Sequence, residues 1–166
     1  MPTSDNLKAA CAGESQANRR YLAFAKKAEA DGFRQVARLF RAVAEAETVH
    51  AHAHLRALQG VKSTADNLQA AIDGEGHEFR EMYPPFVAQA EREGQRAALN
   101  SFKYAMQVEQ THHGLYADAL QAIKAGKDLP PAAVFVCSVC GHTVVGLAPD
   151  ECPVCGAPRD KFMSVS

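Results

Sequence analysis

The sequence has no long apolar run and no excess of charge of either sign. None of its apolar stretches approaches the roughly 20 residues that a membrane-spanning helix needs, and its first residues lack the basic start and apolar core of a secretory signal. Its 18 basic residues are balanced by 19 acidic ones, so we expect no basic surface for nucleic acid or for an anionic membrane. We therefore expect neither kind of partner, and we expect the protein to be cytoplasmic.

Cysteine is scarce over most of the chain. Of five cysteines, Cys11 stands alone, and Cys137, Cys140, Cys152 and Cys155 all lie in the last thirty residues. In a reducing compartment such a cluster favours metal binding over disulfide bonds.

The composition changes near residue 128, from Ala-, Glu- and Leu-rich stretches to prolines, β-branched residues, glycines and cysteines. The first part predicts four helices, over about 3–31, 34–58, 63–93 and 95–125, each followed by a helix-stopping glycine. Short connections favour antiparallel neighbours and a four-helix bundle. We thus predict a mainly α protein with a helical domain over 1–128, a linker at 128–134 and a small metal-binding module over 134–166.

An internal repeat supports the bundle. When the sequence is shifted by 62 positions, eleven residues between Tyr21 and Leu58 recur identically. Coincidence would mainly match Ala and Glu, whereas these matches include Gly, Tyr, Phe and His. The matched pairs include Tyr21/Tyr83, Phe24/Phe86, Gly32/Gly94, Phe40/Phe102, Glu47/Glu109 and His50/His112. A repeated helix pair predicts that the matched polar residues face one another.

Two of the matched pairs form one motif twice, Glu47-x-x-His50 and Glu109-x-x-His112. A spacing of three puts the carboxylate and the imidazole on one helix face. The other two helices supply Glu14, Glu75 and Glu78, and the repeat places Glu14 opposite position 76, between the latter two. Glutamates on two helices and Glu-x-x-His on the other two are the pattern of di-iron or di-manganese carboxylate sites. The alternative is a set of surface charges.

The third helix has two unusual features. Gly74 and Gly76 flank Glu75 at positions where each glycine costs about 1 kcal/mol relative to alanine. Either the backbone comes close to another element there, or the helix is locally loose, which would let Glu78 move on and off a metal. Pro84 and Pro85 should kink the same helix. Tyr21 and Tyr83 are either hydrogen-bonding or proton-donating neighbours of the metal site or ordinary core residues.

The C-terminal cysteines form two Cys-x-x-Cys knuckles, each followed by a glycine, Gly141 and Gly156. The pattern predicts one tetrahedral metal held by four thiolates. Zinc and iron use the same ligands, so the module alone leaves a structural site and a one-electron carrier open. Beside a redox-capable two-metal site, iron is favoured, and zinc could substitute. His142 is expected to be exposed.

Together these motifs resemble rubrerythrin over essentially the whole chain. The segments that carry the resemblance are Gly13-Glu14-Ser15-Gln16-Ala17, Glu47-Thr-Val-His50, Gly74-Glu75-Gly76-His77-Glu78, Met82-Tyr83-Pro84, Glu109-Gln-Thr-His112, and the knuckles Cys137-x-x-Cys140 and Cys152-Pro-Val-Cys155-Gly-Ala-Pro. The resemblance implies a ferritin-like di-iron four-helix bundle followed by a rubredoxin-like domain.

The resemblance also implies an activity, the reduction of hydrogen peroxide to water, and a set of site residues. The implied di-iron ligands are Glu14, Glu47, Glu75, Glu78, Glu109 and His112, with His50 replacing Glu78 on reduction; the implied mononuclear iron ligands are Cys137, Cys140, Cys152 and Cys155. Glu78, His50, Tyr21 and Tyr83 are the candidate catalytic residues. The implied partners are an upstream redox protein or an NAD(P)H-dependent reductase, and a second copy of the chain.

The short linker is expected to bring the C-terminal module poorly to its own helices. The resemblance implies a head-to-tail dimer, in which the module of one subunit serves the helices of the other. Two other classes of function stay open. A ferritin-like protein would oxidise and store Fe(II), although an attached electron carrier argues against this. A zinc protein with a structural bundle would be colourless.

Overall fold

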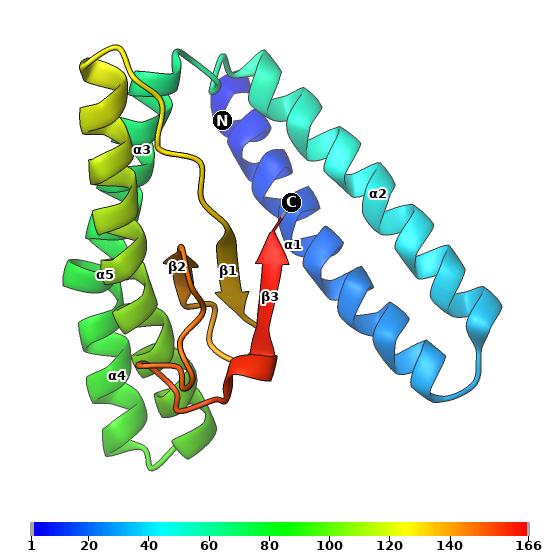
Figure 1. The fold of residues 1–166 in the computed structure, drawn as a ribbon. Coiled ribbons are helices and arrows are strands. Elements are labelled where there is room, and N and C mark those ends of the chain that lie inside the picture. Colours follow the sequence, from blue (N-terminus) through cyan, green and yellow to red (C-terminus); the bar gives the residue numbers. More distant parts are fainter. Residues whose placement is uncertain (1, 166) are drawn as a thin grey trace. The chain divides into compact units, whose positions relative to one another are not determined.

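The computed structural model describes residues 2–165 and contains long helices and a small three-stranded sheet (Figure 1). The predicted mainly α fold with a small C-terminal strand module is confirmed. The chain forms two compact units that divide between Lys62 and Ser63, and each is described by itself. Among the described residues, no helix has both the length and the apolar composition needed to cross a bilayer. The domain boundary at 128–134 stays a prediction.

The first unit is a pair of helices, α1 (Thr3–Ala30) and α2 (Arg34–Ala57), that pack against each other. The chain reverses at Gly32, whose φ of +86° lies in the left-handed region that glycine adopts without strain. Alanines let the two helices approach closely, and Ala37 and Ala44 are fully buried. Asn18 of α1 ties the pair together, because its Nδ2 donates to the Ala44 carbonyl at 2.7 Å.

The second unit begins with a helix that changes type twice. Ser63 caps α3 (Thr64–His77) by accepting a hydrogen bond from the Asp66 backbone N–H at 3.2 Å. The chain continues as a π-helix, η1 (Glu78–Met82), and then as α4 (Tyr83–Arg92). The predicted disturbance of this helix therefore lies just before Pro84 and Pro85. Proline has no N–H and its ring clashes with the carbonyl four residues earlier, so a wider turn there relieves the conflict.

The helix α5 (Arg96–Lys124) packs against both α3 and α4. The repeat is visible in the aromatic residues of the two units. In the first unit the ring centroids of Tyr21 and Phe40 are 6.2 Å apart and those of Phe24 and Phe40 are 5.7 Å apart. The corresponding distances in the second unit are 6.2 Å and 5.6 Å, between Tyr83 and Phe102 and between Phe86 and Phe102. The repeat read from the sequence is thus a structural repeat.

The π-helix marks a one-residue insertion in the second repeat. Tyr83 follows Glu75 by eight positions, whereas Tyr21 follows Glu14 by seven. A π-helical turn accommodates one extra residue without interrupting the helix. This explains why a shift of 62 aligns the tyrosines but places Glu14 opposite position 76.

The C-terminal module is a sheet in the order β2-β1-β3, with β1 (Val134–Cys137) between β2 (Thr143–Val145) and β3 (Phe162–Val165) (Figure 1). Both pairings are antiparallel. A short 3-10 helix, η2 (Arg159–Lys161), leads into β3. The module belongs to the second unit, and β2 contacts α5.

Candidate metal centres

The first unit brings together one predicted group of ligands, Glu14 from α1 with Glu47 and His50 from α2. One ligand atom from each residue lies within 4.8 Å of those of the other two. The Nδ1 atom of His50 lies 2.9 Å from Glu47 Oε2 and 4.0 Å from Glu14 Oε1. The i, i+3 spacing therefore has the predicted effect, because both side chains point to one place beside α1.

The second unit repeats this arrangement with Glu75 from α3 and Glu109 and His112 from α5. The Nδ1 atom of His112 lies 2.8 Å from Glu109 Oε2 and 3.7 Å from Glu75 Oε2. Glu75, rather than Glu78, occupies the place equivalent to Glu14. Burial raises the pKa of the Glu75 carboxyl, and a hydrogen bond with Glu109 raises it further. Two carboxylates held this close share a proton or a cation.

The chemistry of these donors fits divalent metal ions. Each triad offers carboxylate oxygens and one imidazole nitrogen, a mixed set that suits iron, manganese or zinc. A cation between Glu75 and Glu109 would remove the repulsion that now favours protonation. Hence each unit holds one of the two triads of predicted ligands.

Glu78 is the first residue of η1 and lies outside the triads of the described residues. It lies close enough to Tyr83 for its charge to act on the phenol. Burial raises the pKa of Tyr83, and the charges of Glu78, Glu109 and Glu75 raise it further. Tyr83 therefore stays a neutral donor beside the carboxylates. Tyr21 occupies the repeat-equivalent place and packs against Phe24, with ring centroids 6.3 Å apart.

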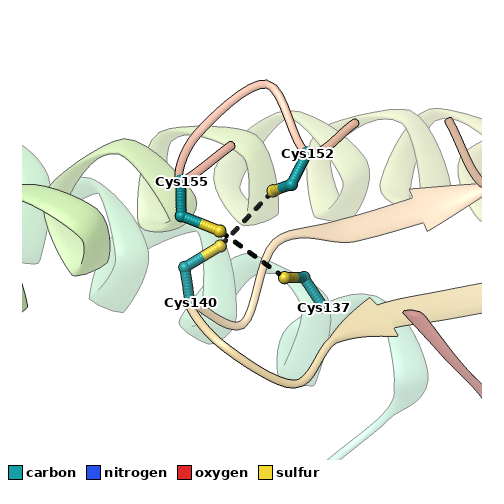
Figure 2. A group of neighbouring side chains, drawn as sticks. All are labelled: Cys137, Cys140, Cys152 and Cys155. Atoms are coloured by element: carbon teal, nitrogen blue, oxygen red, sulfur yellow. Dashed lines mark hydrogen bonds between the residues drawn. The ribbon is translucent and has the colours of Figure 1, made fainter. Parts of the chain in front are cut away.

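The four C-terminal cysteines converge as predicted (Figure 2). The sulfur of Cys137 lies 3.7 Å from that of Cys155, and the sulfur of Cys140 lies 3.6 Å from that of Cys152. Each knuckle turns at its glycine, since Gly141 and Gly156 have φ values of +86° and +73°. No cysteine among the described residues forms a disulfide. The arrangement matches a tetrahedral thiolate site.

The thiols of this cluster do not ionise alike. Burial acts to raise the pKa of Cys137, but hydrogen bonds from the backbone of Cys140 and Val139 outweigh it and lower that pKa. Burial raises the pKa of both Cys140 and Cys155. Backbone N–H groups thus stabilise a first thiolate, and a bound cation would supply the charge that the others need.

The C-terminal module packs against the second triad of its own chain. The Nε2 atom of His112 lies 2.9 Å from Oγ1 of Thr143 on β2. The expectation that the short linker keeps the module from its own helices is therefore wrong for α5. His142, expected to be exposed, is only 9% exposed. Thr143 could not be predicted as a site residue, because it belongs to no motif and lies 31 positions from His112.

Comparisons with known proteins agree with this geometry. The family model described as Rubrerythrin matches residues 5–120, and that of the rubrerythrin rubredoxin-like domain matches residues 135–163. Rubrerythrin-2 of Clostridium acetobutylicum is 36% identical, over 98% of this chain and 96% of its own length. Nigerythrin of Nitratidesulfovibrio vulgaris is 35% identical, over 96% of this chain and 85% of its own length.

Solved structures of nigerythrin match the fold. The mixed-valence state superposes with a TM-score of 0.58 at 34% identity, over 99% of this chain and 87% of that one. The fully reduced state, described as all ferrous, gives a TM-score of 0.59 at 33% identity, with the same coverage. The two family models, the full-length relatives and the two kinds of metal-ligand cluster lead to one conclusion: the chain belongs to the rubrerythrin family, the di-iron proteins of oxidative-stress defence.

Proposed function

We propose that the chain is a non-haem di-iron peroxidase that reduces hydrogen peroxide to water. The reaction consumes one peroxide, two electrons and two protons, breaks the O–O bond and releases two waters. The electrons come from an upstream redox protein or an NAD(P)H-dependent reductase and pass through iron in the four-cysteine module.

The observation that carries the proposal is the contact between Thr143 and His112. It places the four-cysteine module against one of the two carboxylate–histidine triads within a single compact unit. An isolated bundle could store iron and an isolated cysteine site could hold structural zinc. An electron carrier packed on a two-metal site is suited to repeated reduction of that site.

The proposed di-iron ligands are the two triads together with the extra carboxylate. They are Glu14, Glu47, His50, Glu75, Glu78, Glu109 and His112, and the proposed ligands of the third iron are Cys137, Cys140, Cys152 and Cys155. A reduced iron pair would supply two electrons at once, which avoids the one-electron cleavage of peroxide that releases hydroxyl radical. The all-ferrous state described for nigerythrin supports iron as the metal.

The remaining residues of the proposed site either donate hydrogen bonds to the substrate or exchange as ligands. Tyr83, whose pKa is raised by burial and by the neighbouring carboxylates, keeps its phenolic proton and can offer it as a hydrogen-bond donor to a bound peroxide oxygen. We assign the equivalent role to Tyr21 in the first unit. Glu78 lies on a π-helical turn, a backbone type often found at functional sites, and His50 has a half-exposed side chain. The proposed replacement of Glu78 by His50 on reduction requires both side chains to move.

The remaining proposals concern the setting of the protein. We propose a cytoplasmic location and a head-to-tail homodimer by analogy with the family. Because the module already contacts α5 of its own chain, a dimer is not needed for that contact.

Stopped-flow mixing of fully reduced protein with one equivalent of peroxide tests the function. A fast oxidation of both bundle irons by one peroxide is expected, at a rate well above that with an equal concentration of oxygen. A slow reaction, with oxygen preferred and Fe(II) consumed stoichiometrically, would instead identify a ferroxidase. A colourless protein containing zinc in the cysteine site would exclude electron relay.

A further inference from the structure

The hydroxyl of Thr143 makes two hydrogen bonds that together fix its orientation. Thr143 lies on β2, six residues after Cys137 and three after Cys140. Its Oγ1 lies 3.2 Å from the carbonyl oxygen of Gly141 and 2.9 Å from Nε2 of His112.

The two partners determine which atom donates in each bond. A carbonyl oxygen can only accept, so the single hydroxyl proton goes to Gly141. Oγ1 must then accept from His112, and the imidazole carries its proton on Nε2. The lone pair of the neutral ring is then on Nδ1, which lies 2.8 Å from Glu109 Oε2 and 3.7 Å from Glu75 Oε2. This is the tautomer that a metal bound by both carboxylates requires. Contacts this short between a lone pair and carboxylate oxygens require a cation, or a proton carried by the carboxyls, between them.

Thr143 is half-buried and lies close to buried residues. Val108 of α5 is only 2% exposed, and its Cγ1 lies 3.8 Å from where a Cβ atom on Gly141 would be. His142, between Gly141 and Thr143, is also buried. The hydrogen bond to His112 is thus formed near two buried residues, Val108 and His142.

Among the described residues of the first unit, His50 has no matching arrangement. The His50 side chain is 55% exposed, against 25% for His112, and its contacts with Glu47 and Glu14 are made through Nδ1. The two triads thus have equivalent ligands, but the imidazoles of His50 and His112 differ in their exposure and in their surroundings.

We propose that Thr143 is a positioning residue for the metal site of the second unit: its hydroxyl accepts from His112 Nε2 and presents Nδ1 to the metal. The same bond joins the four-cysteine module to a ligand of that site. The inference rests on the proposed function, since it assumes that Glu75, Glu109 and His112 bind metal. Groups that hydrogen-bond to metal-ligating histidines in this way typically contribute 10- to 100-fold to metal affinity or activity.

The test compares three full-length variants. Thr143→Val removes the hydroxyl and keeps the shape, and Thr143→Ser restores the hydroxyl on a smaller side chain. The matched control is Thr111→Val, because Thr111 precedes His112 but its hydroxyl donates to the Gln107 carbonyl. Fe(II) affinity is measured by competition with a chelator. Proton NMR of the reduced iron-loaded protein then reports how fast the ring N–H protons of the ligating histidines exchange with solvent.

The proposal expects T143V to bind bundle iron about 10- to 100-fold more weakly than the unaltered protein and to exchange one histidine N–H faster. T143S should recover most of both properties, and T111V should match the unaltered protein. Unchanged affinity and exchange in T143V would overturn the proposal. So would equal losses in T143S and T143V, which would assign the effect to packing. If the unaltered protein binds no iron in its bundle, the proposed function itself fails, a result distinct from either of these.

Discussion

Gly76 of α3 passes so close to His113 of α5 that a Cβ atom at position 76 would lie 3.3 Å from the His113 ring carbon Cδ2. His113 cannot easily give way, because its ring packs edge-on against Phe79 with centroids 5.5 Å apart. Of the two explanations for the glycines around Glu75, close approach of the backbone therefore holds for Gly76. It does not hold for Gly74, whose added Cβ would meet no described atom within 4 Å.

This difference predicts opposite effects for two alanine substitutions. Gly74→Ala should stabilise the protein by up to about 1 kcal/mol, because alanine favours the helix. Gly76→Ala gains the same propensity but must displace His113 and Arg80, a form of overpacking that costs about 1–3 kcal/mol. Thermal and urea unfolding of both variants measures the contrast. Equal stability of the two would show that the approach of α3 to α5 is looser than the structure indicates.

The raised pKa of Tyr83 predicts a particular loss of stability in alkali. Because burial and the nearby carboxylates raise the pKa of the folded phenol, the unfolded chain loses this proton first as the pH rises. Above the ordinary tyrosine pKa of about 10 the folded state binds more protons, so stability falls with increasing pH. In metal-free protein, Tyr83→Phe should remove part of this fall.

A second variant identifies the cause of that shift. Glu78→Gln removes one of the charges that raise the Tyr83 pKa, so the part of the ultraviolet titration that belongs to Tyr83 should move to lower pH than in the unaltered protein. Binding of divalent metal should act in the same direction, because it neutralises Glu109 and Glu75. A titration curve that neither change moves would leave burial as the whole cause.

Much of the fold could be predicted because local signals agree with tertiary structure. The left-handed glycines Gly32, Gly94 and Gly126 end helices close to the predicted positions, and each has the φ that only glycine adopts freely. The i, i+3 motifs placed Glu109 beside His112, because helix geometry alone determines that contact.

Other features depended on information that a single sequence does not carry. The repeat register could not decide between Glu75 and Glu78 as the partner of Glu14, since the extra residue is absorbed in a π-helical turn with no sequence signature of its own. The burial of His142 and the contact of Thr143 with His112 arise where the C-terminal module packs on α5. Contacts between elements distant in sequence leave no periodicity to read.

Glu78 can be tested against a glutamate of the same π-helical segment. Glu81 is exposed and lies 3.2 Å from His77 Nδ1, one turn away. Glu78→Gln should reduce peroxide turnover by about 10- to 100-fold, the scale of losing a group that tunes a metal site, while Glu81→Gln should leave it unchanged. The measurements are the steady-state turnover with an artificial reductant and the iron content of each variant. Equal turnover in both variants would remove Glu78 from the proposed site.

Loss of a cysteine ligand from the four-cysteine module should stop repeated turnover but leave a single turnover intact. Cys137 is 1% exposed and its sulfur faces that of Cys155 (Figure 2), so Cys137→Ser should abolish the visible iron–thiolate absorption. The bundle ligands are untouched, and chemically reduced C137S should still oxidise its bundle irons once with peroxide. Continuous turnover through the module should be lost, because its electrons no longer reach the bundle.

Cys11→Ser is the matched control for this experiment. Cys11 lies in the first unit, where its sulfur lies 3.6 Å from the Ala51 carbonyl oxygen, so this variant should keep the colour, the dithionite bleaching and the continuous turnover. Full turnover by C137S, with an upstream redox protein or an NAD(P)H-dependent reductase as the electron donor, would show that electrons enter the bundle without the module. The four-thiolate site would then be structural, as zinc would make it, and the contact between Thr143 and His112 would serve only to hold the helix in place.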